Sequence, residues 1–228
     1  MMELKIEQIE NQIINNDCLK ILKHLPDKCI DLILTDPPYG IGNRFKSKFG
    51  LQIQYKTAPS FEWNNQIPSA KVFKEMFRVS KNQIIFGGNY FTKYLKPTNS
   101  WLVWDKIGQY DLKNPFSDCE LAWTSFKCTM KKYTLVNMGF IAQPEEKAKR
   151  IHPTQKPLTL FKMILRDFSK ENDLILDCFS GSGTTAIACS ELKRRFICIE
   201  KDKTYYRKSI ERLENFNKQL RFDFGATI

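Results

Sequence analysis

The sequence predicts an α/β fold with parallel strands, and two observations support this class. Short apolar runs alternate with amphipathic segments along most of the chain, as in βαβ units. The first such unit, from Ile13 to Asp36, takes only about 25 residues, so its two strands are expected to pair in parallel. Strands are expected at 12–15, 30–36, 83–86, 101–104, 120–126, 173–177 and 195–200, and helices at 17–25, 69–79, 89–95, 157–169, 184–192 and 203–216.

Composition limits the domain organisation and the partners. A chain of 228 residues fits one domain, 1–228, and the net charge of +11 predicts a polyanionic partner, most simply nucleic acid. Seven scattered cysteines without a CxxC pair argue against a zinc or other metal site. Their odd number, with no signal peptide, predicts a reducing cytoplasm, and no apolar run approaches the roughly 20 residues of a membrane span.

The first candidate site follows the apolar run at 30–34, which ends in Asp36-Pro37-Pro38-Tyr39. The prolines stiffen the backbone at the carboxyl end of a strand, where open α/β sheets bind ligands. The Asp36 carboxylate and the Pro37 carbonyl can accept the two hydrogens of a nucleobase amine, and Tyr39 can stack on the base. The alternative is a strand and a proline turn, with a surface acid and a packed tyrosine.

A second candidate site combines a strand ending in Asp177, a glycine loop with Gly181 and Gly183, and Glu200 at the end of the next strand. This order is typical of a nucleoside-cofactor site, with the second acid on the ribose hydroxyls. The loop lacks the Gly-Lys-Ser/Thr of a P-loop, which disfavours a triphosphate. An acid beside the loop suits a cationic ammonium, and S-adenosylmethionine (SAM) carries an ammonium, a carboxylate and a ribose.

Three motifs in this order resemble the DNA adenine-N6 methyltransferases: Asp36 to Tyr39, His152-Pro153-Thr154-Gln155-Lys156-Pro157, and Asp177 to Thr185. The catalytic motif precedes the cofactor motif, as in the permuted beta group of that family. The resemblance implies a doubly wound, mostly parallel, Rossmann-like SAM-methyltransferase sheet that is circularly permuted and carries a small target-recognition insertion. Strands at 173–180 and 195–200 would then lie beside the strand at 12–15.

The same resemblance implies residue roles. Asp36 and Pro37 would hold the target amine, Pro38 completes that motif, and Tyr39 would stack on the flipped base. The implied cofactor residues are Asp17, His152, Lys156, Asp177, Phe179, Ser180, Gly181, Ser182, Gly183, Thr184 and Glu200. Lys156 would contact the cofactor carboxylate and Asp17 its adenine. Two alternatives stay open: His152 as a residue that begins a helix, and Asp17 as a simple helix cap.

Two aperiodic segments are candidates for the DNA contact. The segment 40–65 mixes basic and aromatic residues and is expected to form a flap over the substrate; the alternative is a solvated insertion. The segment 105–150 is the expected target-recognition region, and its short length argues against a long recognition sequence. A solvated basic hairpin is the alternative for its second half. The expected DNA contacts are Arg44, Lys46, Lys48, Lys127, Lys131, Lys132, Lys149 and Arg150.

The predicted function is transfer of a methyl group from SAM to adenine N6 in DNA, in line and after base flipping. The alternatives are a cytosine-N4 DNA methyltransferase, an RNA adenine methyltransferase and, in another class, a catalytically idle DNA-binding module. The expected partner is double-stranded DNA, with no membrane contact. A monomer or homodimer is expected, with a restriction endonuclease as a candidate partner in the cell.

Overall fold

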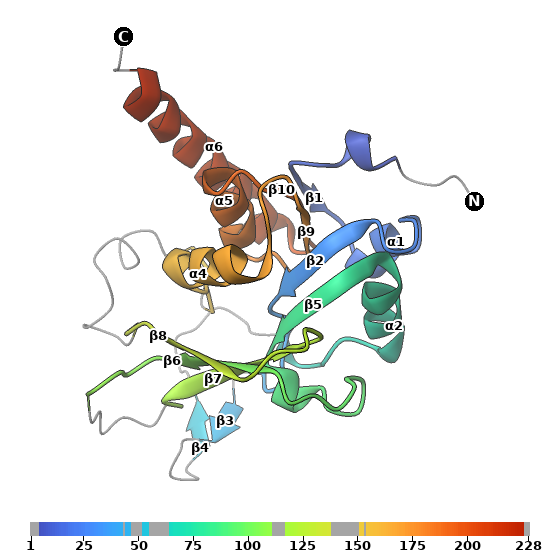
Figure 1. The fold of residues 1–228 in the computed structure, drawn as a ribbon, viewed down its shortest axis with the longest axis vertical. Helices are drawn as coiled ribbons and strands as arrows, with labels where there is room; N and C mark the ends of the chain where they lie inside the picture. Colours follow the sequence, from blue (N-terminus) through green and yellow to red (C-terminus); the bar gives the residue numbers. More distant parts are fainter. Residues whose placement is uncertain are drawn as a thin grey trace.

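The computed structural model describes residues 5–42, 44–46, 52–54, 64–110, 117–137, 151–152 and 154–225, with backbone alone at 44–46, 52–54 and 220–225 (Figure 1). Its main sheet has eight strands in the order β1-β10-β9-β2-β5-β7-β6-β8. The bounds are β1 Gln12–Asn15, β2 Ile30–Thr35, β5 Ser80–Phe86, β6 Trp101–Asp105, β7 Cys119–Thr124, β8 Lys131–Thr134, β9 Leu174–Asp177 and β10 Arg195–Glu200. A separate antiparallel pair joins β3 (Arg44–Lys46) and β4 (Gln52–Gln54).

Helices cover both faces of the parallel half of the sheet, so the predicted doubly wound α/β class is confirmed (Figure 1). The α-helices are α1 Cys18–Leu22, α2 Ala70–Val79, α4 Leu158–Phe168, α5 Thr184–Glu191 and α6 Lys203–Gly225, and two short 3-10 helices are η1 Ile6–Gln8 and η3 Gly88–Tyr90. Helices α1 and α2 lie on one face, and α4, α5 and α6 on the other. Both faces of the central strands are therefore buried over most of their length, which explains the apolar runs Leu32–Leu34, Ile84–Phe86 and Leu174–Leu176.

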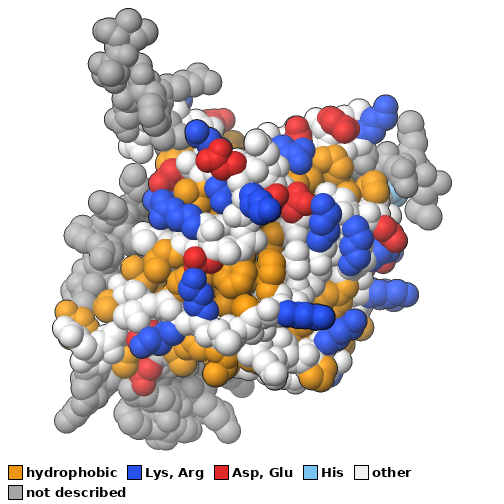
Figure 2. Space-filling view, viewed as in Figure 1, with side chains coloured by type: hydrophobic (Ala, Val, Ile, Leu, Met, Phe, Trp, Pro, Cys, Tyr) orange, Lys and Arg blue, Asp and Glu red, His pale blue; other side chains and the backbone are white. Residues whose placement is uncertain are grey.

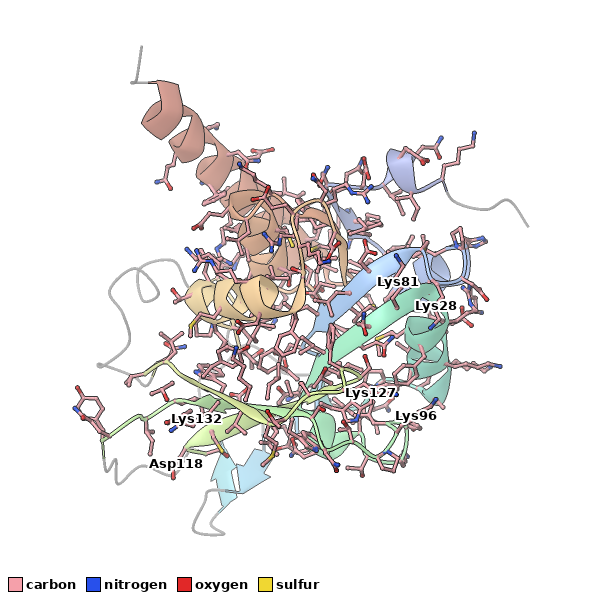
Figure 3. All side chains as sticks on the ribbon, viewed as in Figure 1. Lys28, Lys81, Lys96, Asp118, Lys127 and Lys132 are labelled. Carbon is pink, nitrogen blue, oxygen red and sulfur yellow. The ribbon has the colours of Figure 1, made fainter. Side chains whose placement is uncertain are left out.

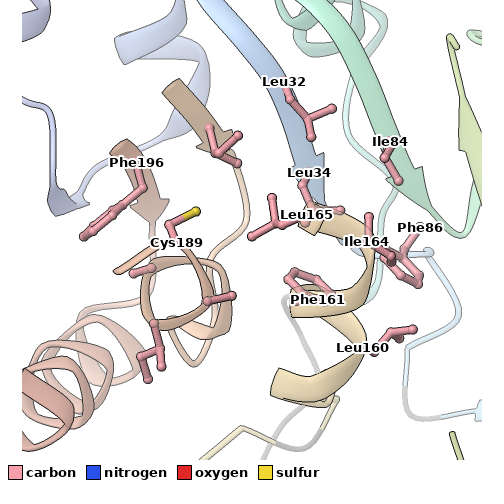
Figure 4. Packing of buried hydrophobic residues seen from close by; sticks show 14 of the residues in the cluster. Leu32, Leu34, Ile84, Phe86, Leu160, Phe161, Ile164, Leu165, Cys189 and Phe196 are labelled. Carbon is pink, nitrogen blue, oxygen red and sulfur yellow. The ribbon is translucent and has the colours of Figure 1, made fainter. Parts of the chain in front are cut away.

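The helix α4 shows how the core is built. Its apolar residues at the helical spacing, Phe161, Ile164 and Leu165, are at most 2% exposed and pack on the sheet (Figure 4). The Phe161 ring stacks on Phe86 of β5, with centroids 5.6 Å apart. Burying a side chain of this size stabilises the fold by about 1.5–3 kcal/mol. This packing holds α4, and the segment that precedes it, against the strand ends.

The first βαβ unit differs from the prediction. Strands β1 and β2 are parallel, but they do not pair, because β10 and β9 lie between them. Proximity in the chain favours pairing, yet β1 pairs with β10 through Ile13 and Cys198, both buried. The placement implied by the family resemblance, with the strands at 173–180 and 195–200 beside the strand at 12–15, is confirmed.

The antiparallel half contains an unpredicted strand. Strand β8 pairs in parallel with β6 at the sheet edge, and only Tyr133 of its four residues is buried. Such an edge strand has little apolar signal, so the segment 127–150 reads as patternless. The expected helix at 89–95 is reduced to η3, and α6 continues beyond residue 216.

The surface carries charges of both signs, and the thiols are free. Lys and Arg side chains spread over the face shown in Figure 2 and are interspersed with Asp and Glu. Among the residues placed by the structure, no helix is long and apolar enough to cross a membrane. All seven cysteines are free; Cys119 and Cys128 are exposed, and Cys18, Cys178, Cys189 and Cys198 are buried.

Candidate active site

The two predicted sites meet at one edge of the sheet. Strand β2 pairs in parallel with β9, with Ile33 opposite Leu176, so Asp36 and Asp177 emerge at the same edge. Both acids line a single cavity of about 1530 Å³. A pocket for one drug-sized ligand usually measures about 300–1,000 Å³, so this cavity is large enough for two adjoining ligands.

The antiparallel half adds a third acid to this edge. Strand β7 runs antiparallel to β5, with Phe86 opposite Ala122, so β7 begins where β5 ends. Glu120, the second residue of β7, therefore comes to the edge at which Asp36 lies. Strand β6 runs antiparallel to β7, and its end brings Lys106 to the same place. Glu120 and Lys106 both line the cavity.

The Asp36 carboxylate is held by a cation and a phenol. The Tyr39 hydroxyl donates to Asp36 Oδ1 at 2.6 Å, and Lys156 Nζ forms an ion pair with Oδ2. Lys156 Nζ also lies 3.2 Å from Glu120 Oε2, and Lys106 Nζ lies 3.4 Å from Glu120 Oε1. Positive and negative groups thus alternate from Lys106 to Asp36. The sequence prediction placed the Lys156 ammonium on the cofactor carboxylate, whereas here it lies between two protein carboxylates.

Burial and these charges set the protonation of the cluster. Burial raises the pKa of Asp36, and Lys156 offsets part of that rise. Burial alone would lower the pKa of Lys156, but Asp36 and Glu120 raise it above its ordinary value. For Glu120 the charges of Lys156 and Lys106 outweigh burial, so its pKa is lowered. Opposite charges therefore offset much of the cost that burial imposes on the ionised forms of the cluster.

Tyr39 is half-buried at the cavity wall and is held by several neighbours. Its ring stacks on Tyr90, with centroids 4.8 Å apart and planes 12° apart. Gly87 (φ 67°) lies against the same ring, and a Cβ added there would lie 2.1 Å from a ring carbon. The backbone N–H of Tyr39 donates to Asn64 Oδ1 at 2.8 Å, and Asn64 also bonds to Gly42. Gly42 lies near the start of the predicted flap and Asn64 near its end. Their hydrogen bonds therefore hold the two ends of the flap together beside the Asp36 motif.

Asp177 is held by neutral donors instead. Its carboxylate accepts hydrogen bonds from the hydroxyls of Thr35 (2.7 Å) and Thr185 (2.5 Å) and from the N–H of Phe179 (3.0 Å). The side chain is almost fully buried, and burial raises its pKa to about 6. These bonds tie β2, β9 and the start of α5 together.

The glycine loop is fixed by Glu200 at the end of β10. Glu200 Oε2 accepts from the N–H of Gly181 at 2.7 Å, and Oε1 accepts from the N–H of Asp202 at 2.7 Å. Gly181 has a positive φ of 51°, and the His152 ring lies 3.6 Å from where its Cβ would be. The pKa of His152 is lowered to about 4 by burial and by Lys156, so the ring is neutral at pH 7.

Arg212 of α6 supports the next part of the loop. Its guanidinium donates to the Ser182 carbonyl at 3.0 Å and to the Thr184 hydroxyl at 3.1 Å. The Thr184 hydroxyl also donates to the Lys156 carbonyl at 3.3 Å. Gly183 (φ 73°) begins α5 and faces Ser209 of α6 and Ile13 of β1. The side of the loop that faces away from the cavity is therefore packed against α6 and β1.

Asp17 combines a structural contact with a place in the cavity wall. Its Oδ1 accepts from the N–H of Leu19, which caps α1, and its Oδ2 lies 3.1 Å from Lys201 Nζ. The capping alternative thus describes a bond that is present. Asp17 also lines the cavity, so the predicted adenine contact stays a prediction.

The structure brings most of the predicted site residues together. The cavity is lined by Asp36, Pro37, Pro38, Tyr39, Asp17, His152, Lys156, Asp177, Phe179, Ser180, Gly181, Ser182, Thr184 and Glu200. Of the predicted cofactor residues, Gly183 does not line it, because it packs on α6 and β1. The individual roles stay predictions, since geometry alone does not assign them.

The predicted DNA contacts are less concentrated. Lys127 is exposed, Lys131 is 2.7 Å from Asp167, and Lys132 is 3.3 Å from Asp105. Figure 3 shows Lys127 and Lys132 at separate places in the antiparallel half. The side chains of Arg44, Lys46, Lys48, Lys149 and Arg150 lie outside the described part of the chain, so their contacts with DNA stay predictions.

Sequence reasoning missed several residues of the site. They are Glu120, Lys106, Asn64, Tyr90 and Arg212, each of which contacts a predicted site residue or lines the cavity. Glu120 could not be found from spacing, because only the antiparallel register of β7 brings it to this edge. A weak signal did exist, since a charged residue at the start of an otherwise apolar strand needs a partner when it is buried.

Comparison with known proteins places the chain in a family. The family model N6_N4_Mtase, described as DNA methylase, matches residues 90–211, more than half of the chain. The type II methyltransferase M.HpaI of Haemophilus parainfluenzae is 28% identical, over 91% of this chain and 75% of that protein. The type II methyltransferase M2.DpnII of Streptococcus pneumoniae is 26% identical, over 90% of each chain.

Solved structures agree in fold. The M1.HpyAVI–SAM complex matches with a TM-score of 0.55 and 24% identity, over 89% of this chain and 98% of that one. The PvuII DNA methyltransferase, which is cytosine-N4-specific, matches with a TM-score of 0.56 and 16% identity, over 91% of each chain. The motif order, the shared edge of Asp36 and Asp177 and the family match agree: the chain belongs to the DNA methylase family, and it is a DNA methyltransferase.

Proposed function

We propose that this enzyme transfers a methyl group from SAM to the exocyclic N6 amine of adenine in double-stranded DNA. One observation carries the proposal: the Asp36 motif and the Asp177 glycine loop open into the same cavity from neighbouring strand ends. A donor held at one strand end and an extruded base held at the other would be adjacent, which direct transfer requires.

The cofactor end of the cavity fits SAM. Ser180 Oγ is buried and has no hydrogen-bond partner among the described residues, so a ligand group can use it. Gly181 leaves room beside the His152 ring, and Glu200, which lines the cavity, would bind the ribose. Residues 177–184 would hold the methionine end. When bound, SAM supplies a methyl group on a positively charged sulfonium.

The target end of the cavity fits an amine. An ionised carboxylate offers about four lone-pair positions, and Tyr39 and Lys156 occupy two of those on Asp36. Asp36 can therefore still accept a hydrogen from the amine, with the Pro37 carbonyl as the proposed second acceptor. Because the amine is inaccessible within the duplex, the base must be flipped out, which costs a few kcal/mol.

The same site would stack the base on aromatic rings. Tyr39 is the proposed platform, and Tyr90, which is 44% exposed, covers one side of it. An incoming base would displace Tyr90 or stack beside it. Adenine is proposed rather than cytosine because the residue before Pro37-Pro38-Tyr39 is Asp, which in the family that the motifs resemble favours adenine.

The remaining parts of the proposal concern organisation and partners. We place the flap at 40–65 and the target-recognition region at 105–150, within one catalytic domain of 1–228. The basic residues of these segments, Lys127 among them, would contact phosphates. A monomer or homodimer acting in the cytoplasm, with a restriction endonuclease as a cellular partner, completes the proposal.

The test is methyl transfer with product analysis. The purified chain is incubated with isotope-labelled SAM and, in parallel reactions, with unmethylated plasmid DNA or with RNA, and the digested nucleosides are identified by mass spectrometry. We expect labelled N6-methyl-2′-deoxyadenosine. Labelled N4-methylcytosine would overturn the choice of base, preferential labelling of RNA would overturn the choice of nucleic acid, and absence of transfer would contradict the proposal.

A further inference from the structure

The acid Glu120 has no role in the proposed reaction, yet it lies in the middle of the charged cluster. Its side chain is 25% exposed, and those of Lys106, Lys156 and Asp36 are 11%, 7% and 17% exposed. Removing charges from water costs several kcal/mol for each ion, even after the protein relaxes. An ion pair between Lys156 and Asp36 alone would have balanced the charge with fewer buried ions.

The Lys156 ammonium lies between two carboxylates and forms an ion pair with each of them. Nζ pairs with Asp36 on one side and lies 3.2 Å from Glu120 Oε2 on the other, while Lys106 holds the second oxygen of Glu120 at 3.4 Å. The Oε2 contact is an ion pair without hydrogen-bond geometry, so this oxygen acts on Lys156 through its charge. The aromatic rings of Phe86 and Tyr39 lie 5.4 and 5.7 Å from Nζ and confine it further.

We infer that Glu120 is a positioning residue that acts through Lys156, and this inference rests on the proposed methyl transfer. By attracting the ammonium from the other side, Glu120 limits how fully Lys156 neutralises Asp36. The ammonium thus orients the Asp36 carboxylate without neutralising it fully, and Asp36 keeps enough negative charge to accept a hydrogen from the target amine. Without Glu120, Lys156 would pair with Asp36 alone and weaken it as an acceptor.

Tyr39, Asp177, His152 and Lys106 also lie close enough to interact with the cluster. Tyr39 and Asp177 also act on Asp36: the phenol donates to it, and Asp177 is close enough for the two carboxylates to repel. His152 lies close enough to feel the Lys156 charge and is neutral at pH 7. Lys106 offsets the charge of Glu120. Glu120 raises the pKa of Asp36 and Lys156 lowers it. Removing the charge of Glu120 should therefore lower the pKa of Asp36, and removing that of Lys156 should raise it.

The experiment is a double-mutant cycle with Glu120→Gln, Lys156→Met and the double variant, in which kcat, KM for DNA, SAM affinity and the pH profile of kcat are measured. We expect Glu120→Gln to lower kcat about 10-fold, with SAM affinity within about twofold of the parent. The acidic limb of its profile should move to lower pH, and that of Lys156→Met to higher pH. The double variant should be no slower than Lys156→Met.

A matched control removes a carboxylate charge elsewhere. Glu191 pairs with Lys162 at 2.6 Å in another part of the fold, so Glu191→Gln should leave kcat and the pH profile unchanged. Glu120→Asp, which keeps the charge, should restore much of the parent profile. Glu120→Ala, which also removes the charge, replaces Glu120→Gln if that variant fails to fold.

Three results would overturn the inference: an unchanged kcat in Glu120→Gln, a pH profile that does not move, or effects of the two substitutions that simply add. Additivity would mean that Glu120 acts on the substrate or the fold directly. A parent enzyme that transfers no methyl group would instead contradict the proposed function.

Discussion

The ends of β2 and β9 carry two buried carboxylates that are held in opposite ways. Asp177 accepts from two threonine hydroxyls and one backbone N–H, all neutral. Asp36 is held by the ammonium of Lys156 and the phenol of Tyr39, within a cluster of four charges. Neutral donors satisfy the hydrogen-bonding capacity of an acid and tie elements together. Charged partners also change its pKa. From this comparison we propose that the acid at β9 supports the fold and the cofactor loop, and that the acid after β2 acts on the target amine.

The strongest test of this difference is Asp36→Ala. The variant removes an acceptor proposed to act on the target amine, so kcat should fall by about 10²–10³-fold or more. SAM affinity should stay nearly unchanged, because the residues of the glycine loop are intact. Initial rates of methyl transfer and calorimetric titration with SAM measure the two quantities. Near-normal methylation of DNA would show that the role given to Asp36 is wrong.

The converse variant, Asp177→Ala, should affect the fold and the cofactor end. It leaves the hydroxyls of Thr35 and Thr185 and the N–H of Phe179 without their acceptor. Each buried donor that loses its partner costs about 1–3 kcal/mol, so with three donors the free energy of unfolding should fall by about 3 kcal/mol or more. Urea denaturation measures this change. A stable variant with unaltered SAM affinity but no turnover would remove the distinction between the two acids.

The pH dependence of stability sharpens the same comparison. Burial raises the pKa of Asp177 to about 6, above the value of about 3.9 in an unfolded chain. Between these values the folded state binds more protons than the unfolded state, so this residue makes the protein less stable as pH rises from about 4 to 6. In the variant Asp177→Asn that contribution, about 2–3 kcal/mol over the window, should be absent.

The measurement is urea denaturation at several pH values for the parent and Asp177→Asn. The difference between the two curves isolates this carboxyl from the others. Parallel curves between pH 4 and 6 would show that the hydroxyl donors keep Asp177 ionised throughout the window, despite its burial.

The smallest expected effect concerns Gly87. In Gly87→Ala the new Cβ meets the Tyr39 ring, so the ring must move away from its place over the Asp36 motif. We expect kcat to fall about 10-fold, in addition to a strain of roughly 1 kcal/mol from the positive φ. The control is Gly108→Ala, which has a similar φ of 59° but meets only side-chain methyl groups at 3.2–3.4 Å. Equal kcat in the two variants would argue against a role for the Tyr39 position.

The central part of the fold could be predicted from the sequence because it is buried on both faces. The apolar runs Leu32–Leu34, Leu174–Leu176 and Phe196–Ile199 form the middle of β2, β9 and β10. At the end of each strand, or one residue beyond it, stands an acid of the site: Asp36, Asp177 or Glu200. Asp36, Asp177 and Glu200 therefore followed from local pattern. Their shared edge also followed, because strands of a parallel sheet end on the same side.

The antiparallel half could not be predicted in the same way. Strand β8 has one buried residue, and Glu120 reaches the cavity only because β7 runs antiparallel to β5. The partners of Lys156 also depend on this long-range register. The family resemblance identified Lys156 as a site residue, but the carboxylates around its ammonium come from the loop after β2 and from β7, which lie far apart in the chain.

The distribution of thiols has a practical consequence. Burial raises the pKa of Cys178, Cys189 and Cys198, so these core thiols should resist alkylation at neutral pH. Cys119 is exposed at the cavity wall, next to Glu120. After Cys128→Ser removes the other exposed thiol, a maleimide fluorophore at position 119 would report on an extruded base that enters the cavity, without an engineered attachment point.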